Sequence, residues 1–367
     1  MRAALLQAVG QPVEVVHDVE LEPPGAGEVR VGIVACGVCH SDVSLVNGTF
    51  PVLGPTVPGH EAAGIVTEVG PGVTSLAVGD HVVLTPNPAC GTCELCVRGQ
   101  HSSCANAMSI ATSMLPDGTT RLSRQGEIVY RGLGLAGWAD EVIVPVAGAV
   151  RIDEDVPLDV ACVIGCAVQT GVGAVLNTAD VEPGDTVLVL GAGGIGISIV
   201  QGAAIAGAAR IIVSDPSESR REQAMRFGAS DVIDPTVDDV TAQVTAMTGI
   251  GVDVAFEAVG SGPLVETALA STRSGGSVVM VGAAPIEDVV PVSPVMMMFT
   301  EKKIMGSLLG SCWAPRDIPR LIALWQAGRL DLDGMITARR PLEEVNEAIA
   351  DLEAGRGLRT VLTIAPS

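Results

Sequence analysis

Four of the nine cysteines in this 367-residue chain crowd into one short segment. Cys90, Cys93 and Cys96 are separated by two-residue gaps, and Cys104 follows shortly after them. In a reducing compartment such clustering favours a metal over disulfides, because thiolates at this spacing can bind one tetrahedral ion. Four thiolates leave no coordination position open for a substrate. The segment therefore predicts a structural zinc site, with a set of free surface thiols as the alternative.

Three further metal-binding side chains, Cys39, His60 and Cys166, lie far apart in the sequence. Two thiolates and one imidazole would neutralise a zinc ion and leave a fourth position for water or substrate, which is the composition of a catalytic site. Spacing alone does not pair them, because each taken singly is more often a buried core residue. The remaining cysteines show no partner pattern and are expected to be small core residues: Cys36, Cys162 and Cys312.

A glycine-rich turn near the middle of the chain separates an apolar strand from an apolar helix. The strand is expected over Thr186–Leu190 and the helix over 197–208. The G-x-G-x-x-G pattern between them supplies Gly191, Gly193, Gly194 and Gly196. Glycines in this context let the pyrophosphate of a dinucleotide approach the helix N-terminus, whose N–H groups and dipole favour anions. The sequence therefore predicts a dinucleotide-binding turn.

Asp215 follows the next expected strand, Arg210–Ser214, at the position where a carboxylate can accept hydrogen bonds from both ribose hydroxyls. The same carboxylate would repel a 2′-phosphate, so the sequence favours NAD over NADP. Arg220 and Arg221 are near enough in sequence to soften that preference.

Strands and helices alternate after this turn, which predicts a parallel, doubly wound sheet of the α/β class. Helices are expected over 218–227 and 263–270, and strands over 252–256 and 276–281. The chain before Gly165 instead has short strands between Pro and Gly residues, which predicts a β-rich first domain. Its clearest strands are expected over 29–34, 62–69 and 80–84, and the C-terminal part adds helices over 317–327 and 342–353 and a strand over 359–364.

Composition narrows the classes of partner. The 21 basic against 42 acidic side chains leave a formal net charge of −21, which repels nucleic-acid backbones and anionic lipid headgroups. We therefore expect neither nucleic acid nor a membrane as a partner. The N-terminus lacks the apolar run and cleavage site of a secretory signal, which predicts a cytoplasmic protein. The uncharged stretch 186–209 is long enough to span a bilayer, but its glycines favour a strand, a turn and a helix.

Taken in order, the two cysteine sets, the His60–Glu61 pair and the glycine turn resemble the zinc-dependent alcohol dehydrogenases of the medium-chain dehydrogenase/reductase superfamily. The resemblance runs from about Val29 to Thr363. It implies a β-rich GroES-like catalytic domain over 1–167, completed by 308–367, and a Rossmann NAD-binding domain over 168–307. The active site would lie in the cleft between these domains.

The resemblance also implies the metal ligands. Cys39, His60 and Cys166 look like the ligands of a catalytic zinc, the Cys2His set known from alcohol dehydrogenase, and the four clustered cysteines look like the ligands of a structural zinc. Each subunit would then hold two zinc ions. Asp42 resembles the carboxylate that orients the zinc-bound histidine, and Glu61 the acidic neighbour of the metal.

Other residues match family positions for protons and cofactor. Ser41 resembles the hydroxyl that takes the alcohol proton. The positions that resemble cofactor contacts are His40, Thr170, Arg220 and Arg359. The implied reaction is reversible hydride transfer from the zinc-bound alkoxide of a primary alcohol to NAD, which gives the aldehyde. The small-molecule substrate is thus an alcohol or aldehyde, and the cofactors are zinc and NAD.

Three features depart from patterns within the family. Ser44 stands at the outer end of the proton relay, where a histidine is usual. Phe50 and Met108 replace the acid and arginine expected of glutathione-dependent formaldehyde dehydrogenases, which argues against that subfamily. Pro86 and Gly132 replace large aromatic residues and predict a wider pocket, suited to medium or bulky primary alcohols such as aromatic or terpenoid ones.

A homodimer is expected, because the long segment between Cys104 and Trp138 resembles that of dimeric family members. The run Met296–Met298 and the stripe of Leu321, Leu324 and Trp325 are expected to form core or subunit contacts.

The alternatives within the superfamily are a polyol or formaldehyde dehydrogenase and an aldehyde reductase. The zinc-free quinone and enoyl reductases lack these ligands, and a non-enzymatic role would predict a lost ligand or a blocked glycine turn.

Overall fold

The computed structural model describes residues 1–107 and 109–364, so Met108 lies outside the described residues. The chain forms two compact units. The first comprises Met1–Cys166, Trp313–Ala327 and the chain from Leu332 onward, and the second comprises Ala167–Cys312 with Gly328–Asp331. The chain returns to the first unit after Cys312 and not after residue 307, because the intervening segment is bonded to the second unit. Within that segment the Ser311 hydroxyl is 2.8 Å from Thr178 Oγ1, and Cys312 donates to the Gln169 carbonyl.

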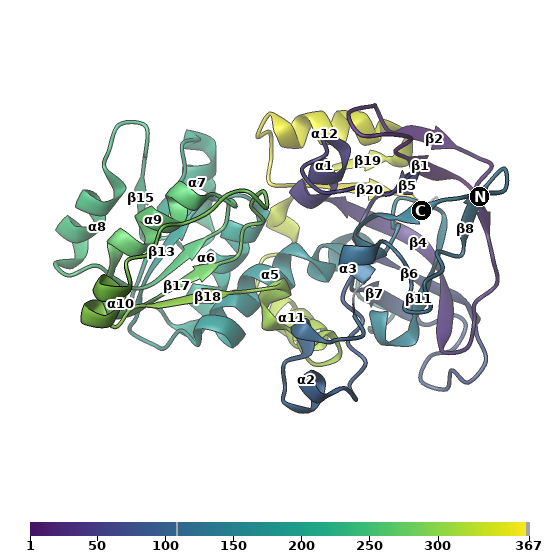
Figure 1. Cartoon of the computed structure of the whole chain (residues 1–367), viewed down its shortest axis with the longest axis horizontal. Helices are drawn as coiled ribbons and strands as arrows, with labels where there is room; N and C mark the ends of the chain where they lie inside the picture. The colour runs from purple at the N-terminus through teal and green to yellow at the C-terminus, as the bar shows by residue number, and fades with distance from the viewer. Residues whose placement is uncertain (108, 365–367) are drawn as a thin grey trace. The chain divides into compact units, whose positions relative to one another are not determined.

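A seven-stranded, mostly antiparallel sheet is the framework of the first unit (Figure 1). Its order is β12-β7-β6-β4-β20-β19, and β11 also pairs with β4. The strands are β4 (Glu28–Val38), β6 (Glu61–Val69), β7 (His81–Leu84), β11 (Glu141–Pro145), β12 (Ala149–Arg151), β19 (Ile336–Pro341) and β20 (Arg359–Thr363). The unit also contains smaller sheets. Two are pairs, β1 (Ala3–Leu5) with β2 (Glu14–Val16) and β5 (Thr56–Val57) with β10 (Tyr130–Arg131), and one has three strands, β3 (Glu20–Leu21), β8 (Leu122–Arg124) and β9 (Glu127–Ile128).

The strand expected over 29–34 continues to Val38 in β4, and this extension positions the site. Burial alternates from Val29 to Val34, as in a sheet with one face in the core, and then becomes continuous. The change occurs where β6 and β20 both pair with the end of β4, with Gly37 opposite Glu61 and Thr360 opposite Val38. Cys39 directly follows Val38, so the buried end of β4 holds it inside the unit.

The second unit confirms the predicted doubly wound parallel sheet. Its order is β15-β14-β13-β16-β17-β18, which is the 3-2-1-4-5-6 order of dinucleotide-binding folds. The strands are β13 (Thr186–Leu190), β14 (Arg210–Ser214), β15 (Asp231–Ile233), β16 (Val252–Glu257), β17 (Thr272–Met280) and β18 (Lys303–Gly306). The connecting helices are α6 (Gly194–Ala206), α7 (Glu218–Arg226), α8 (Val240–Thr248), α9 (Gly262–Ser271) and α10 (Pro294–Thr300), each of which is labelled in Figure 1.

Helix α6 begins at Gly194, earlier than the expected residue 197. Gly193 is its N-cap, so the later glycines of the turn belong to the helix. A Cβ on Gly196 would lie 1.8 Å from the Gly191 carbonyl oxygen, so only glycine allows the helix to start this close to the strand.

The remaining helices complete both units. In the first unit they are α1 (His40–Val46), α2 (Glu94–Val97), α3 (Ser109–Thr112), α4 (Leu158–Ala161), α11 (Ala314–Gln326) and α12 (Val345–Glu353); α5 (Ala167–Gly173) opens the second unit. Leu321 is buried on α11, whereas Met296 and Met298 on α10 are 56% and 64% exposed. The methionine run is therefore not core, and its expected role in a subunit contact stays a prediction.

Among the described residues, no single helix is long and apolar enough to cross a membrane. The uncharged stretch 186–209 contains β13, the glycine turn and α6. One bent pair of helices, Leu158–Gly165 with Ala167–Ala179, is long and apolar enough to cross a membrane by length and composition alone. Most of its residues are buried in the structure.

Candidate metal centres and nucleotide-binding turn

Cys39, His60 and Cys166 meet in the first unit, although they come from three distant segments. Their ligand atoms and a Glu61 carboxylate oxygen all lie within 4.8 Å of one another, and all four residues are buried. Cys39 follows β4 and His60 precedes β6, so the pairing of these strands brings them together. Cys166 ends a 3-10 turn over Cys162–Gly165 that packs on β6. The sheet therefore assembles a set of donors that sequence spacing could not pair.

Asp42 fixes the orientation of the histidine in this cluster. Its carboxylate is fully buried and accepts hydrogen bonds from the backbone N–H of Cys39 (3.1 Å) and of Gly59 (2.9 Å). It also lies 3.0 Å from Nδ1 of His60, and a carboxylate there makes Nδ1 the protonated nitrogen. The other nitrogen, Nε2, is buried without a hydrogen-bond partner. A buried Nε2 with no hydrogen-bond partner beside two thiols is the arrangement expected of a zinc ligand, so the residues fit the metal.

Glu61 and Arg359 form a buried ion pair beside the cluster, with 3.6 Å between Oε1 and Nη2. Burial raises the pKa of the Glu61 carboxyl to about 7, although the Arg359 guanidinium opposes the rise. Arg359 also donates to the Val38 carbonyl at 3.2 Å. The resemblance assigns Arg359 to the cofactor, and that role stays a prediction; the structure places its guanidinium next to Glu61 of the cluster.

The other residues predicted to carry the proton or contact the cofactor lie on helices α1 and α5. His40 and Ser41 form the first turn of α1; His40 is exposed and Ser41 is half-buried. Thr170 is on α5 in the second unit, and its buried Oγ1 has no hydrogen-bond partner.

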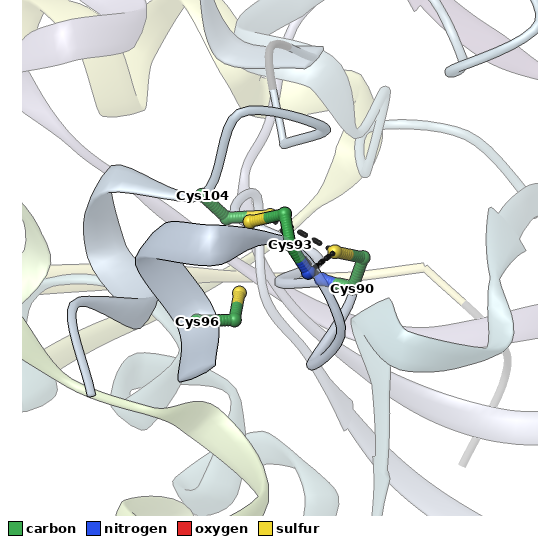
Figure 2. Close-up of side chains that lie close together, drawn as sticks. All are labelled: Cys90, Cys93, Cys96 and Cys104. Atoms are coloured by element: carbon green, nitrogen blue, oxygen red, sulfur yellow. Dashed lines mark hydrogen bonds between the residues drawn. The ribbon is translucent and has the colours of Figure 1, made fainter. Parts of the chain in front are cut away.

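The four clustered cysteines converge from a single loop around α2 (Figure 2). The Cys104 and Cys90 sulfurs are 3.5 Å apart, and those of Cys93 and Cys104 are 3.8 Å apart. The backbone N–H and hydroxyl of Thr92, with the N–H of Cys93, lower the pKa of Cys90 to about 5. Burial raises the pKa of Cys96 to about 12. The hydrogen bonds thus favour the thiolate form of Cys90, whereas burial favours the thiol form of Cys96. A bound cation would favour the thiolate form of both, so the four sulfurs fit a metal site.

Two contacts attach this loop to the rest of the first unit. The His101 ring stacks on the Trp313 ring with centroids 4.7 Å apart and an angle of 14° between the planes. The Asn87 side chain donates to the Ser102 carbonyl at 3.2 Å. Sequence analysis missed the stacked pair, because nothing in the sequence connects a residue of the cysteine loop with one at the start of α11.

Asp215 is held against the glycine turn of the second unit. One carboxylate oxygen accepts from the Ala192 N–H and the other from the Ser217 N–H, each at 2.8 Å. Arg220 Nη1 is 3.9 Å from this carboxylate. Arg221 instead pairs with Asp234 at 2.9 Å and donates to the Asp215 carbonyl. Of the two arginines, only Arg220 therefore presents its charge to the carboxylate.

Two known protein families match the chain, one in each unit for the most part. Residues 25–154 match the alcohol dehydrogenase GroES-like domain, and residues 194–327 match the zinc-binding dehydrogenase family. The putative alcohol dehydrogenase D of Mycobacterium tuberculosis is 39% identical over 98% of both chains. An NDMA-dependent alcohol dehydrogenase of Amycolatopsis methanolica has the same identity and coverage. The solved structure of benzyl alcohol dehydrogenase from Acinetobacter calcoaceticus is 31% identical, covers 99% of each chain, and superposes with a TM-score of 0.93.

Proposed function

We propose that this chain, which belongs to the zinc-dependent alcohol dehydrogenases of the medium-chain dehydrogenase/reductase superfamily, transfers a hydride reversibly between a primary alcohol and NAD. Its relatives make it an oxidoreductase of the alcohol dehydrogenase type. The observation that carries the proposal is the buried Cys39–His60–Cys166 cluster, in which Asp42 holds Nδ1 of His60 and leaves Nε2 facing two thiols.

In this proposal Cys39, His60 and Cys166 hold the catalytic zinc. When bound there, zinc supplies Lewis-acid chemistry that polarises an alcohol or carbonyl oxygen. Asp42 keeps His60 in the tautomer that binds metal. The half-buried Ser41 accepts the alcohol proton and passes it outward, and with Ser44 in place of the usual histidine the proton leaves to solvent or by another route. The four clustered cysteines hold the second, structural zinc.

The preference for NAD is carried by Asp215. Both of its oxygens are oriented by backbone N–H groups, so the carboxylate cannot turn away from a bound ribose. A 2′-phosphate would therefore meet a fixed negative charge. Arg220 weakens this repulsion without removing it, because its nearest nitrogen is 3.9 Å from the carboxylate.

For the substrate we propose a medium or bulky primary alcohol. The support is that Pro86 is smaller than the aromatic residue expected at its position, and that one structural neighbour is a benzyl alcohol dehydrogenase. Gly132 opens no space, because a Cβ there would lie 2.7 Å from the Cα of Pro58. An aldehyde reductase or polyol dehydrogenase remains the second candidate, since the same cluster serves both directions of the reaction.

For the assembly we propose a homodimer. Apolar side chains gather on the surface of the segment leading into β18, the last strand of the parallel sheet, and patches of this kind mark interaction sites. Ile286 is 94% exposed, Val289 77% and Phe299 74%. Sedimentation of the wild type should give a dimer and Phe299→Lys should shift it toward the monomer. A tetramer, or a variant that sediments like the wild type, would overturn this assignment.

The experiment that tests the function is alcohol-dependent reduction of NAD and of NADP by the purified, zinc-replete protein. Primary, secondary and aromatic alcohols are compared, and because one relative is named as NDMA-dependent, the assay is repeated with NDMA as electron acceptor. We expect turnover with NAD that rises in catalytic efficiency from ethanol to benzyl alcohol and disappears in Cys39→Ala. No turnover with any alcohol or aldehyde, despite bound zinc and cofactor, would reject the proposal.

A further inference from the structure

Trp138 is the largest fully buried side chain among the described residues, and it has no part in the roles described above. Its ring nitrogen, Nε1, donates to the Gly37 carbonyl at 3.4 Å. Its backbone N–H donates to the Pro58 carbonyl at 3.0 Å, and the N–H of Gly137 donates to the Gly59 carbonyl at 2.7 Å. The short segment before β11 therefore bonds to two places in the first unit, the end of β4 and the turn that leads into β6.

Each of these two places carries a donor of the buried cluster. Gly37 lies two residues before Cys39, and Gly59 directly precedes His60. Gly59 has a φ of +92°, which glycine adopts readily, and a Cβ built on it would lie 2.8 Å from Cγ of Trp138. The indole thus packs against the turn at a position where only glycine leaves room for it. Its ring contacts the segment of His60, and its N–H binds the segment of Cys39.

The contacts of Trp138 reach the donor atoms through Asp42. The Gly59 N–H donates to Oδ1 of Asp42, the oxygen that lies 3.0 Å from Nδ1 of His60. The Cys39 N–H donates to the other carboxylate oxygen. Because a protein interior is close-packed, a shift of the turn or of the end of β4 is transmitted to the side chains that it supports. Groups behind metal ligands set metal affinity in this way.

We propose that Trp138 is a positioning residue for the buried metal cluster: its indole holds the end of β4 and the Gly59–His60 turn at the separation that lets Cys39 and His60 bind one ion. The inference rests on the proposed catalytic zinc site. It adds a residue that touches neither the metal nor the substrate, and it predicts an effect confined to one of the two metal sites.

A core residue elsewhere in the same unit provides a matched control. Leu122 is 3% exposed and belongs to the same hydrophobic core as Trp138. It lies on β8, which pairs with β3 and β9, and none of these strands carries a donor of the cluster. Leu122→Ala should therefore lower stability, as large-to-small core substitutions do, without disturbing the metal site. A tryptophan whose role is only structural should behave like Leu122.

The first test is cadmium-113 NMR of the full-length protein loaded with cadmium in place of zinc. The two sites differ in their donor atoms and should give separate resonances, so the four-cysteine loop serves as an internal reference. Trp138→Phe keeps an aromatic ring and removes Nε1, whereas Trp138→Leu also removes the ring. Both variants should shift the resonance of the buried site and leave that of the loop in place. Leu122→Ala should move neither resonance.

The second test is the zinc affinity of the buried site, measured by competition with a chelating dye. Trp138→Phe should weaken binding about two- to tenfold, the scale of one neutral hydrogen bond. Trp138→Leu should weaken it about 10- to 100-fold, as the loss of other groups behind metal ligands does. Leu122→Ala should bind zinc like the wild type.

Trp138→Phe is the milder variant and decides the question even if Trp138→Leu does not fold. A buried-site resonance and a zinc affinity that match the wild type in Trp138→Phe would overturn the inference while the metal site itself stood. Equal shifts of both resonances would also overturn it, because the effect would then be general. A wild-type protein that binds cadmium only at the four-cysteine loop would overturn the proposed function together with the inference.

Discussion

The two cysteine sites of the first unit are built in opposite ways. The cluster of Cys90, Cys93, Cys96 and Cys104 comes from one loop, and two of its thiols are half-exposed. The cluster of Cys39, His60 and Cys166 comes from three segments joined by the sheet, and every member is buried. In the loop, backbone N–H groups of the same loop stabilise the sulfurs. In the buried cluster a separate carboxylate, Asp42, orients the donors.

The difference teaches what each site can do without the rest of the fold. A loop that supplies all four ligands needs only a cation to close it, so a metal bound there would contribute stability. A cluster assembled by strand pairing exists because the fold already holds it, so a metal bound there would be available for chemistry. Damage to the buried cluster should therefore abolish activity and leave folding intact, and damage to the loop should do the reverse.

The largest expected effect follows from Cys166→Ala. Loss of one catalytic zinc ligand removes several kcal/mol of charge stabilisation, so turnover should fall by at least about a thousandfold. Melting should change little. Cys162→Ala is the matched control, because Cys162 is equally buried in the same short helical segment but lies outside the ligand cluster. Steady-state turnover and metal content of both variants make the comparison, and an active Cys166→Ala would remove the distinction between the sites.

Asp42→Asn also tests the buried cluster, through the residue that orients its histidine. An amide has only one acceptor oxygen, so its NH2 group would face a donor among the three N–H groups that Asp42 binds. Misorientation of His60 should lower turnover and zinc affinity by about 10- to 100-fold. Asp80→Asn is the control, since Asp80 accepts from the Ala77 N–H elsewhere in the unit. Competition with a chelating dye measures the affinity, and equal values for both variants would exclude a role for Asp42 in orienting the ligand.

Cys104→Ala tests the four-cysteine loop. Loss of the structural metal should lower the melting temperature by about 5–10 °C, which corresponds to a few kcal/mol in a protein of this size. Turnover per folded molecule at low temperature should stay within about threefold of the wild type. Ser103→Ala changes the exposed neighbouring residue and should do neither. Calorimetry and turnover measured on the same samples decide, and a thousandfold loss of turnover in Cys104→Ala would contradict the division of roles.

This contrast also explains how far the sequence could predict the molecule. The loop's ligands were recognisable from spacing alone, because they are local. The strand, turn and helix around Gly191 were recognisable for the same reason, and the doubly wound sheet followed from the alternation after it. The buried cluster needed a family resemblance, since only the pairing of β4 with β6 brings Cys39 and His60 together.

Contacts between residues that are far apart in the sequence could not be predicted from it. The ion pair of Arg359 with Glu61 forms only because β20 pairs with β4, and nothing in the sequence connects the two residues. The methionine run was expected to be core or a subunit contact, and its exposure leaves only the second. In each case the missing information is tertiary burial.

The smallest expected effect concerns the only ring-stacking contact among the described residues, between His101 and Trp313. A stacked pair contributes about 0.5–1.5 kcal/mol, so His101→Ala should lower the melting temperature by only about 1–4 °C. His101→Phe keeps an aromatic ring and should restore it. Because Trp313 precedes α11, chelation of the loop metal should change the emission of this tryptophan in the wild type and in His101→Phe, but not in His101→Ala. If chelation changes the emission of all three proteins equally, the loop does not communicate with α11 through this contact, and the structural site is more self-contained than its attachment implies.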